Sequence, residues 1–305
     1  MLAAIAAMLI AFSIGSNDTS NAFGVSIGSG VLTFRRAILL LGIFVTFGAL
    51  TQRKVMYTVG SLANLNTALI ATALFTSAFV IVFSNWRGFP VSSHQAIVGS
   101  LVGAGVAVGS AKLDLLSSIV ISWIASPITA LFIAILIYSA LERILSKVPL
   151  FLAERVISMM LLFSGAVIAY NTGANELATA LGPVVSSGHL NATIAALLGS
   201  ASLFAGAVLL SGRVVETVGK GITPLDAFSG FSAQMAAGLT VFAFTLLGMP
   251  VSTTYCIIGS VAGVGMLKGL ASVRLHLIKK IMASWVITPA FSFTVCFLIG
   301  LLMGY

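Results

Sequence analysis

Two segments of nearly the same sequence combine a proline with a cluster of hydroxyl groups: PVSSHQAIVGS at residues 90–100 and PVSTTYCIIGS at residues 250–260. Proline is favoured in the first turn of a helix, and the N–H groups that follow a helix start have no partner within the helix. With the positive end of the helix dipole, these donors would form an anion site. We therefore predict an anion site formed by Ser92, Ser93, Gln95, Ser252, Thr253 and Thr254.

The same hydroxyl groups could instead bond back to the helix that carries them, as serine and threonine often do. The repetition of the pattern, with proline in both copies, favours the anion site. His94 is compatible with a direct role or with packing, and Tyr255 fits packing or gating better than binding.

Two further segments, SNDTSN at residues 16–21 and NTGANE at residues 171–176, each place one carboxylate among amides and hydroxyls. The composition described below places both segments within the membrane. Inserting a carboxylate at the centre of a membrane costs at least about 2.5–3.5 kcal/mol. Such oxygen atoms suit a small hard cation such as sodium, or a proton. Helix caps are the alternative, but a cap needs no carboxylate at that depth. The predicted cation ligands are Asn17, Asp18, Asn21, Asn175, Glu176 and Thr179.

The composition identifies an integral membrane protein, since 59% of the 305 residues are hydrophobic and 7% are charged, whereas soluble domains carry about 25% charged residues. The net charge of +8 comes from short clusters between apolar runs, without interleaved aromatics, which argues against nucleic-acid binding. The two cysteines suggest neither a disulfide framework nor a metal site. The few acids and three histidines form no catalytic constellation, so we expect neither an enzyme nor a cofactor.

Ten apolar runs follow one another, and the last five repeat landmarks of the first five. Three landmarks recur in the same order at separations of 158, 160 and 162 residues: Asn17 and Asn175, Pro90 and Pro250, Trp123 and Trp285. We predict an all-α fold of two repeats, residues 1–150 and 151–305, each with about five membrane segments, broken helices and re-entrant hairpins. The runs at 2–34 and 156–187 are each interrupted by a polar segment and are too long for one plain helix, because about 20 residues cross the hydrocarbon.

The basic residues are unevenly distributed over the loops. Loops after the odd-numbered runs hold twelve of them: Arg35, Arg36, Arg87, Arg143, Lys147, Arg155, Arg213, Lys220, Lys268, Arg274, Lys279 and Lys280. The alternate loops hold three: Arg53, Lys54 and Lys112. Because cytoplasmic loops carry the excess of lysine and arginine, we expect a multi-pass protein of the cell membrane with both termini outside. The second repeat would then be inverted relative to the first, as in many secondary transporters.

The polar segments resemble the inorganic phosphate transporter family, the sodium- or proton-coupled phosphate permeases. The hallmark of this family is a motif similar to GANDxxNA in each half, and this chain has GSNDTSNA at residues 15–22 and GANELATA at residues 173–180, besides the two PVS segments. The resemblance implies an inverted-repeat fold, a homodimer, phosphate between two re-entrant hairpins, and cations near the Asn-Asp motifs. The second half departs from the family pattern at Glu176, Thr179 and Tyr255, where Asp, Asn and His are usual.

The resemblance also assigns residues by match. It places the anion-site residues named above on the phosphate side. The cation side receives Asn17, Asp18, Asn21, Asn175 and Glu176. Thr19 and Thr179 fit either side, and we group Thr19 with the phosphate and Thr179 with the cation.

The predicted function is uptake of inorganic phosphate by alternating access, coupled to sodium or proton symport. An inside-negative potential opposes anion uptake by about 2.3 kcal/mol per charge per 100 mV, and co-bound cations in excess of the anion's charge reverse that sign. Two alternatives stay open, a sulfate permease of the same fold and a passive anion channel. A P–OH group beside Asp18 or Glu176 would favour phosphate over sulfate, and a channel would not need cation-binding oxygens.

Overall fold

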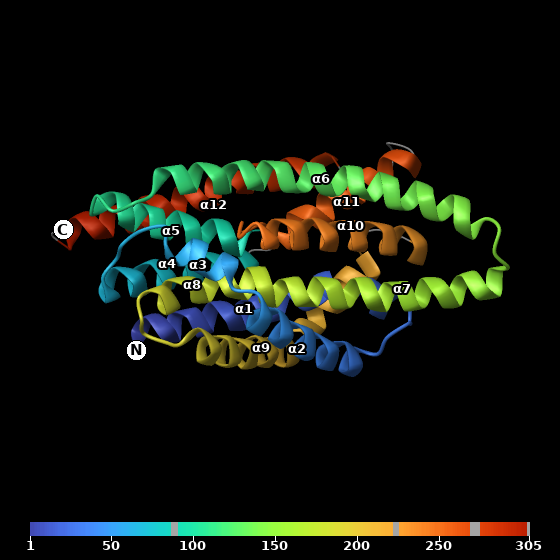
Figure 1. Ribbon diagram of the computed structural model, residues 1–305, viewed down its shortest axis with the longest axis horizontal. Coiled ribbons are helices and arrows are strands. Elements are labelled where there is room, and N and C mark those ends of the chain that lie inside the picture. The colour runs from blue at the N-terminus through green and yellow to red at the C-terminus, as the bar shows by residue number, and fades with distance from the viewer. Residues whose placement is uncertain (87–90, 222–225, 269–274, 304–305) are drawn as a thin grey trace.

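Helices make up most of the computed structural model, which describes residues 1–86, 91–221, 226–268 and 275–303 (Figure 1). The helices are α1 (Leu2–Gly28), α2 (Phe34–Thr51), α3 (Lys54–Gly60), α4 (Thr67–Trp86), α5 (Ser93–Ala107), α6 (Leu113–Leu145), α7 (Leu150–Asn171), the π-helical turn η1 (Thr172–Leu177), α8 (Ala178–Ser186), α9 (Ala192–Gly221), α10 (Ala227–Leu246), α11 (Thr253–Lys268) and α12 (Leu275–Leu302).

Eight helical segments of the described chain are long and apolar enough to cross a membrane. Large apolar side chains are exposed on the outside of the bundle, among them Phe79, Leu136 and Val286. A helix satisfies its own backbone hydrogen bonds, so such a surface can face lipid. The predicted all-helical membrane protein is confirmed.

Two pairs of neighbouring helices, α4 with α5 and α10 with α11, form hairpins at opposite ends of the bundle (Figure 1). Their second arms, α5 and α11, have 15 and 16 residues, so at 1.5 Å per residue each falls short of the roughly 30 Å hydrocarbon core. Arg87 and Pro90, which the sequence places between α4 and α5, lie outside the described residues.

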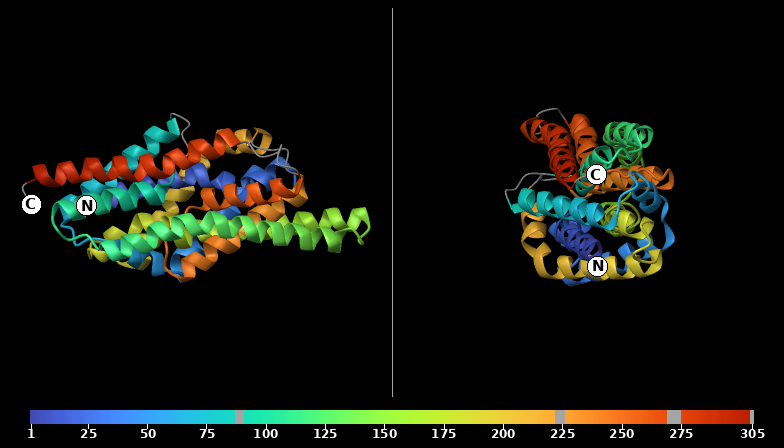
Figure 2. Two further views of the ribbon diagram at one scale, coloured as in Figure 1. Left: turned by 90° about the horizontal axis from the view of Figure 1, so that it is seen from above. Right: turned by 90° about the vertical axis from the view of Figure 1, so that its left-hand side faces the viewer.

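Both ends of the chain lie at the same end of the bundle, which faces the viewer in the right-hand view of Figure 2. The connections from α1 to α2 and from α6 to α7 lie at the other end (Figure 1). Basic residues gather at these connections: Arg35 and Arg36 lie in the first turn of α2, Arg143 lies in the last turn of α6, and Lys147 lies between α6 and α7. They are therefore separated from both termini by the length of the bundle.

The prediction that polar segments interrupt the two longest runs was wrong for the first run. α1 is one helix of 27 residues that passes through residues 16–21 without a break. Ser16, Thr19 and Ser20 donate hydrogen bonds to carbonyls of their own helix, at 2.7–2.8 Å, so the polar side chains are satisfied without opening the backbone. In the second run, the polar segment forms η1, and the chain continues directly from α7 into α8.

Glycines bring helices of the two predicted repeats to backbone contact. A Cβ atom on any of ten glycines would lie 1.9–2.6 Å from a carbonyl oxygen of a facing helix, and eight of these contacts fall into two groups. Four of these contacts join α1 to α9 and α2 to α7 and η1: Gly15 with Leu203, Gly206 with Phe12, Gly173 with Val45, and Gly48 with Tyr170. Four more join α5 to α12 and α11 to α6: Gly99 with Pro289, Gly103 with Phe293, Gly259 with Pro127, and Gly263 with Leu131. Each contact links residues 1–150 to residues 151–305.

We expect Gly206→Ala to destabilise the protein and Gly212→Ala, on the same helix, to leave its stability unchanged or higher. A Cβ at position 206 would lie 1.9 Å from the oxygen of Phe12, whereas the nearest atom to a Cβ at position 212 is 3.8 Å away. Overpacking typically costs about 1–3 kcal/mol, while alanine in a helix gains up to about 1 kcal/mol over glycine. Thermal unfolding in detergent measures both, and an equal shift for the two variants would contradict the close contact of α1 with α9.

Candidate functional site

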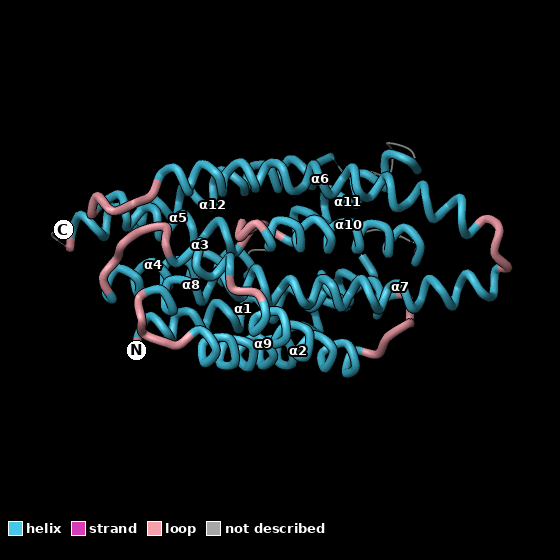
Figure 3. The backbone as a smooth tube through the Cα atoms, in the orientation of Figure 1, coloured by secondary structure: helices cyan, strands magenta, loops and turns pink. Residues whose placement is uncertain are grey.

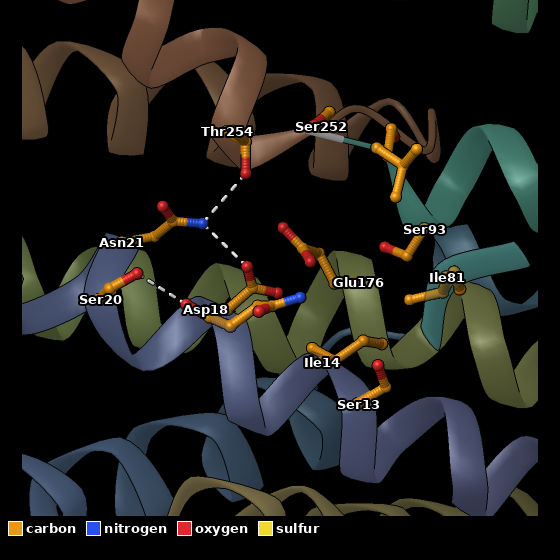
Figure 4. A pocket seen from close by; sticks show the side chains of 13 residues that line it. Ser13, Ile14, Asp18, Ser20, Asn21, Ile81, Ser93, Glu176, Ser252 and Thr254 are labelled. Atoms are coloured by element: carbon orange, nitrogen blue, oxygen red, sulfur yellow. Dashed lines mark hydrogen bonds between the residues drawn. The ribbon is translucent and has the colours of Figure 1, made fainter. Parts of the chain in front are cut away.

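A cavity of about 180 Å³ lies between α1, the two hairpins and η1 (Figure 4). One water molecule needs roughly 10–15 Å³ on this kind of measure, so the cavity has room for several small groups. The residues that line it are Ser13, Ile14, Asn17, Asp18, Ser20, Asn21, Ile81, Val91, Ser92, Ser93, Glu176, Ser252 and Thr254.

One wall of the cavity is a single face of α1. Positions three or four residues apart lie on the same face of a helix, so Ser13, Asn17 and Asn21 line up beside Ile14 and Asp18. The Asn21 Nδ2 atom donates to Asp18 Oδ1 at 2.8 Å and to Thr254 Oγ1 at 3.1 Å. The amide thus links the carboxylate of the first half to the hydroxyl of the second hairpin.

The second carboxylate of the cavity comes from η1. Glu176 is 4% exposed and Asp18 is 7% exposed, and Figure 4 shows the two carboxyl groups on neighbouring walls of the cavity. Among the described residues, no lysine or arginine lines the cavity. Two carboxylates this close repel each other unless a cation or a proton lies between them, so the arrangement favours a positively charged ligand.

Hydroxyl groups at two helix starts complete the cavity. Ser92 and Ser93 lie at the start of α5, and Ser252 and Thr254 at the start of α11. The first-turn N–H groups of both helices have no partner one turn back and carry the positive end of the helix dipole. The Ser92 Oγ atom is buried and has no hydrogen-bond partner among the described residues. A buried polar atom without a partner is rare in proteins, and this one belongs to a residue of the cavity wall.

Five of the predicted site residues do not line the cavity: Thr19, Gln95, Asn175, Thr179 and Thr253. Thr19 and Thr179 each donate at 2.8 Å to the carbonyl four residues earlier in their own helix. The Gln95 Oε1 atom accepts from the Tyr255 hydroxyl at 3.1 Å. Thr253 is fully buried.

Asn175 lies between the hairpins instead. Its Nδ2 atom donates to Thr245 Oγ1 at 2.7 Å and to the Met249 carbonyl at 3.1 Å. Its Oδ1 atom contacts His94 Nε2 at 2.8 Å and accepts from the Val251 N–H at 3.2 Å. His94 and Tyr255 thus both make side-chain contacts within the packed region around the cavity.

Five lining residues were not predicted from the sequence: Ser13, Ile14, Ser20, Ile81 and Val91. The helical period of α1 is a signal that would have found Ser13 and Ile14, which lie four residues before Asn17 and Asp18. Ile81 on α4 carries no polar group, and only the packing of α4 against α1 brings it to the cavity.

The sequence is similar to known proteins along nearly its whole length. Residues 14–296 match the model of the phosphate transporter family. A Methanocaldococcus jannaschii protein named as a phosphate permease is 38% identical over 97% of this chain and 95% of the relative. A Haemophilus influenzae protein of the same description is 26% identical over 96% of this chain and 94% of its own length.

Among solved structures, one described as the sodium-dependent phosphate transporter superposes with a TM-score of 0.84 at 24% identity. The match covers 99% of this chain and 98% of the other, so the whole helical fold is shared. These matches agree with the transporter class predicted from the polar segments and not with an enzyme. The chain belongs to the phosphate transporter family.

Proposed function

We propose that this protein takes up inorganic phosphate together with sodium by alternating access. The observation that carries the proposal is the juxtaposition in one cavity of two hydroxyl-bearing helix starts and two carboxylates. The named activities of the matched relatives point to the same substrate, and the name of the matched solved structure points to sodium.

On the phosphate side, we assign the hydroxyl groups of Ser92, Ser93, Ser252 and Thr254 with the first-turn N–H groups of α5 and α11. This assignment is supported by the position of all four residues in the cavity wall and by the buried Ser92 Oγ atom, for which the described residues offer no hydrogen-bond partner. Hydroxyl and backbone N–H groups can bind an oxyanion without a lysine or arginine. The positive charge that balances the anion can then come from the co-transported cation, whose gradient drives uptake.

On the cation side, we assign Asn17, Asp18, Asn21 and Glu176, whose oxygens lie in the same cavity. A cation bound there offsets the charge of the anion, which the membrane potential otherwise opposes by about 2.3 kcal/mol per charge per 100 mV. A hydrogen phosphate P–OH group can also donate to a carboxylate, whereas sulfate has no such proton. The nearby Asp18 and Glu176 therefore favour phosphate over sulfate.

We also propose that residues 1–150 and 151–305 are inverted repeats whose re-entrant hairpins are α4–α5 and α10–α11. The glycine contacts support this, because Gly15–Leu203 and Gly173–Val45 are related by a shift of 158 residues at both members. The basic residues at the end of the bundle away from the termini support termini on the outer side of the cell membrane. The homodimer implied by the family resemblance stays a prediction, and cross-linking in the membrane would test it.

The experiment that tests the coupling is phosphate uptake into proteoliposomes with and without a sodium gradient, with sulfate in parallel. A tenfold sodium gradient supplies about 1.4 kcal/mol per ion, so uptake should rise with the gradient and saturate at low phosphate. A proton gradient of the same size is the comparison. Uptake that ignores both gradients would contradict coupling and favour the anion channel, and equal uptake of sulfate would contradict the assigned selectivity.

A further inference from the structure

The last residue of α10 and the connection to α11, residues 246–252, are here called the second tip. Figure 3 shows this connection as a loop in the middle of the bundle, where the connection between α2 and α3 also lies. The second tip leads directly into Ser252 and Thr254 of the cavity wall. Its position therefore fixes where the second set of hydroxyl groups lies.

Three of the last carbonyls of α10 accept hydrogen bonds from backbone N–H groups that follow them in the chain. Leu247 N–H donates to Ala243, Gly248 N–H to Thr245 and Met249 N–H to Phe244, at 2.9–3.2 Å. Gly248 has a φ of 77°, the left-handed conformation that closes a helix in this way. The carbonyl of Leu246 is not used in this closure.

Side chains from three other elements bind the backbone of the second tip. Lys54 Nζ, at the start of α3, donates to the Leu246 carbonyl at 2.8 Å. Trp123 Nε1, on α6, donates to the Pro250 carbonyl at 2.9 Å. Asn175, in η1, donates to the Met249 carbonyl and accepts from the Val251 N–H. Four backbone groups within six residues are thus held by side chains outside the hairpin.

The orientation of the Asn175 amide follows from these partners. The Met249 carbonyl can only accept and the Val251 N–H can only donate, so Nδ2 faces the first and Oδ1 the second. His94 Nε2, which contacts the same Oδ1 atom, must then be the donor. Both Nδ2 hydrogens and both Oδ1 lone pairs are used, which leaves Asn175 no lone pair for a cation.

We propose that Lys54, Trp123 and Asn175 are positioning residues that hold the second tip as a rigid wall of the phosphate site. The expected effect on phosphate uptake rests on the proposed function, whereas the rigidity of the second tip does not depend on it. Lys54 is charged and bound to the C-terminal end of a helix, where a cation is stabilised by the helix dipole. Trp123 belongs to the SWIASP segment, which recurs at Trp285 and which the binding site itself does not use.

The test combines hydrogen exchange of the peptide covering residues 246–254 with phosphate uptake, on folded protein in lipid nanodiscs and proteoliposomes. Lys54→Met and Trp123→Phe should each speed exchange of this peptide by roughly threefold to tenfold, the effect of losing one hydrogen bond. The phosphate concentration for half-maximal uptake should rise by a similar factor, with the maximal rate within about twofold of the wild type. Lys54→Arg should restore both, and Lys112→Met, a charge change at the start of α6, should alter neither.

Asn175→Asp separates positioning from cation binding, because it keeps the size of the side chain but replaces the Nδ2 donor to Met249. If Asn175 is a positioning residue, hydrogen exchange of the second tip should be faster in this variant and phosphate binding should be weaker. If Asn175 is a cation ligand, the sodium dependence of phosphate uptake should change while hydrogen exchange of the second tip stays unaltered. That result would overturn the inference for Asn175.

The inference as a whole is overturned if the peptide covering residues 246–254 exchanges its amide hydrogens at the wild-type rate in both Lys54→Met and Trp123→Phe. It is equally overturned if they lose thermal stability while half-saturation by phosphate stays unchanged, since that is a purely structural role. Absence of phosphate uptake by the wild-type protein would instead refute the proposed function, and the exchange data would still decide whether the second tip is held.

Discussion

Asp18→Asn is expected to abolish sodium-driven phosphate uptake while the protein stays folded. Asparagine has nearly the same shape as aspartate, and its Oδ1 atom can still accept the 2.8 Å hydrogen bond from Asn21. What the variant loses is the negative charge in a cavity where the described part of the chain places no lysine or arginine. The hydrogen bonds that define the cavity are thus largely kept, and the attraction for a cation is not.

The size of the effect follows from the charge. Two opposite unit charges 4 Å apart attract by about 4 kcal/mol at an effective dielectric constant of 20. A loss of that order weakens cation binding by roughly a thousandfold. Since Glu176 keeps its own carboxylate, some sodium binding should survive, but too weakly to drive uptake at the concentrations at which the wild type is saturated.

Uptake in proteoliposomes at increasing sodium concentration measures this loss, and thermal unfolding checks the fold. Asp114→Asn is the matched control, because Asp114 is an exposed acid in the first turn of α6 and does not line the cavity. Wild-type sodium dependence in Asp18→Asn would remove Asp18 from the cation site. Loss of uptake in both variants would show that the assay responds to acid residues in general.

The sequence was sufficient to predict most of the helices, the starts of the second hairpin arms and much of the cavity, but it missed the short helix α3 and predicted a break in α1 that is not there. Apolar runs long enough to cross a membrane become helices, because without water each backbone N–H and C=O group must find its hydrogen-bond partner within the protein. The repeated proline-hydroxyl phrase identified the starts of α5 and α11, and eight of the thirteen predicted site residues line one cavity. Whether these eight bind the ligands assigned to them is what the experiments above decide.

The sequence could not tell which face of α1 lies against the cavity. Asp18 and Thr19 are adjacent, but successive residues of a helix point about 100° apart, so Asp18 faces the cavity and Thr19 bonds to Gly15. The roles of Lys54 and Trp123 were equally hidden, because each depends on contact with a backbone more than a hundred residues away. Tertiary packing, and not local pattern, decides such contacts.

Replacing Ser92 and Ser252 together with alanine should raise the phosphate concentration needed for half-maximal uptake by roughly a hundredfold or more. A hydrogen bond to a charged group contributes about 1.5–3 kcal/mol, and each 1.4 kcal/mol is a factor of ten. The two hydroxyls come from different hairpins but line the same cavity, so their losses are coupled through the phosphate that both would bind. Each single variant should show a smaller rise than the double variant, and the cycle of the two single variants and the double variant measures the coupling.

The double variant should keep its fold, because Ser92 makes no side-chain capping bond to α5 and the Ser252 hydroxyl accepts only a long bond of 3.4 Å from Tyr255 N–H. The matched control is Ser100→Ala with Ser260→Ala, two buried serines later in the same helices that bond to Ser77 and to Cys256, away from the cavity. This control removes the same atoms from the same helices, so its cost should appear in thermal stability and not in half-saturation. An equal rise in both double variants would mean that the hydroxyls of Ser92 and Ser252 act through helix packing. Phosphate would then have to be bound by the backbone N–H groups and the hydroxyls of Ser93 and Thr254.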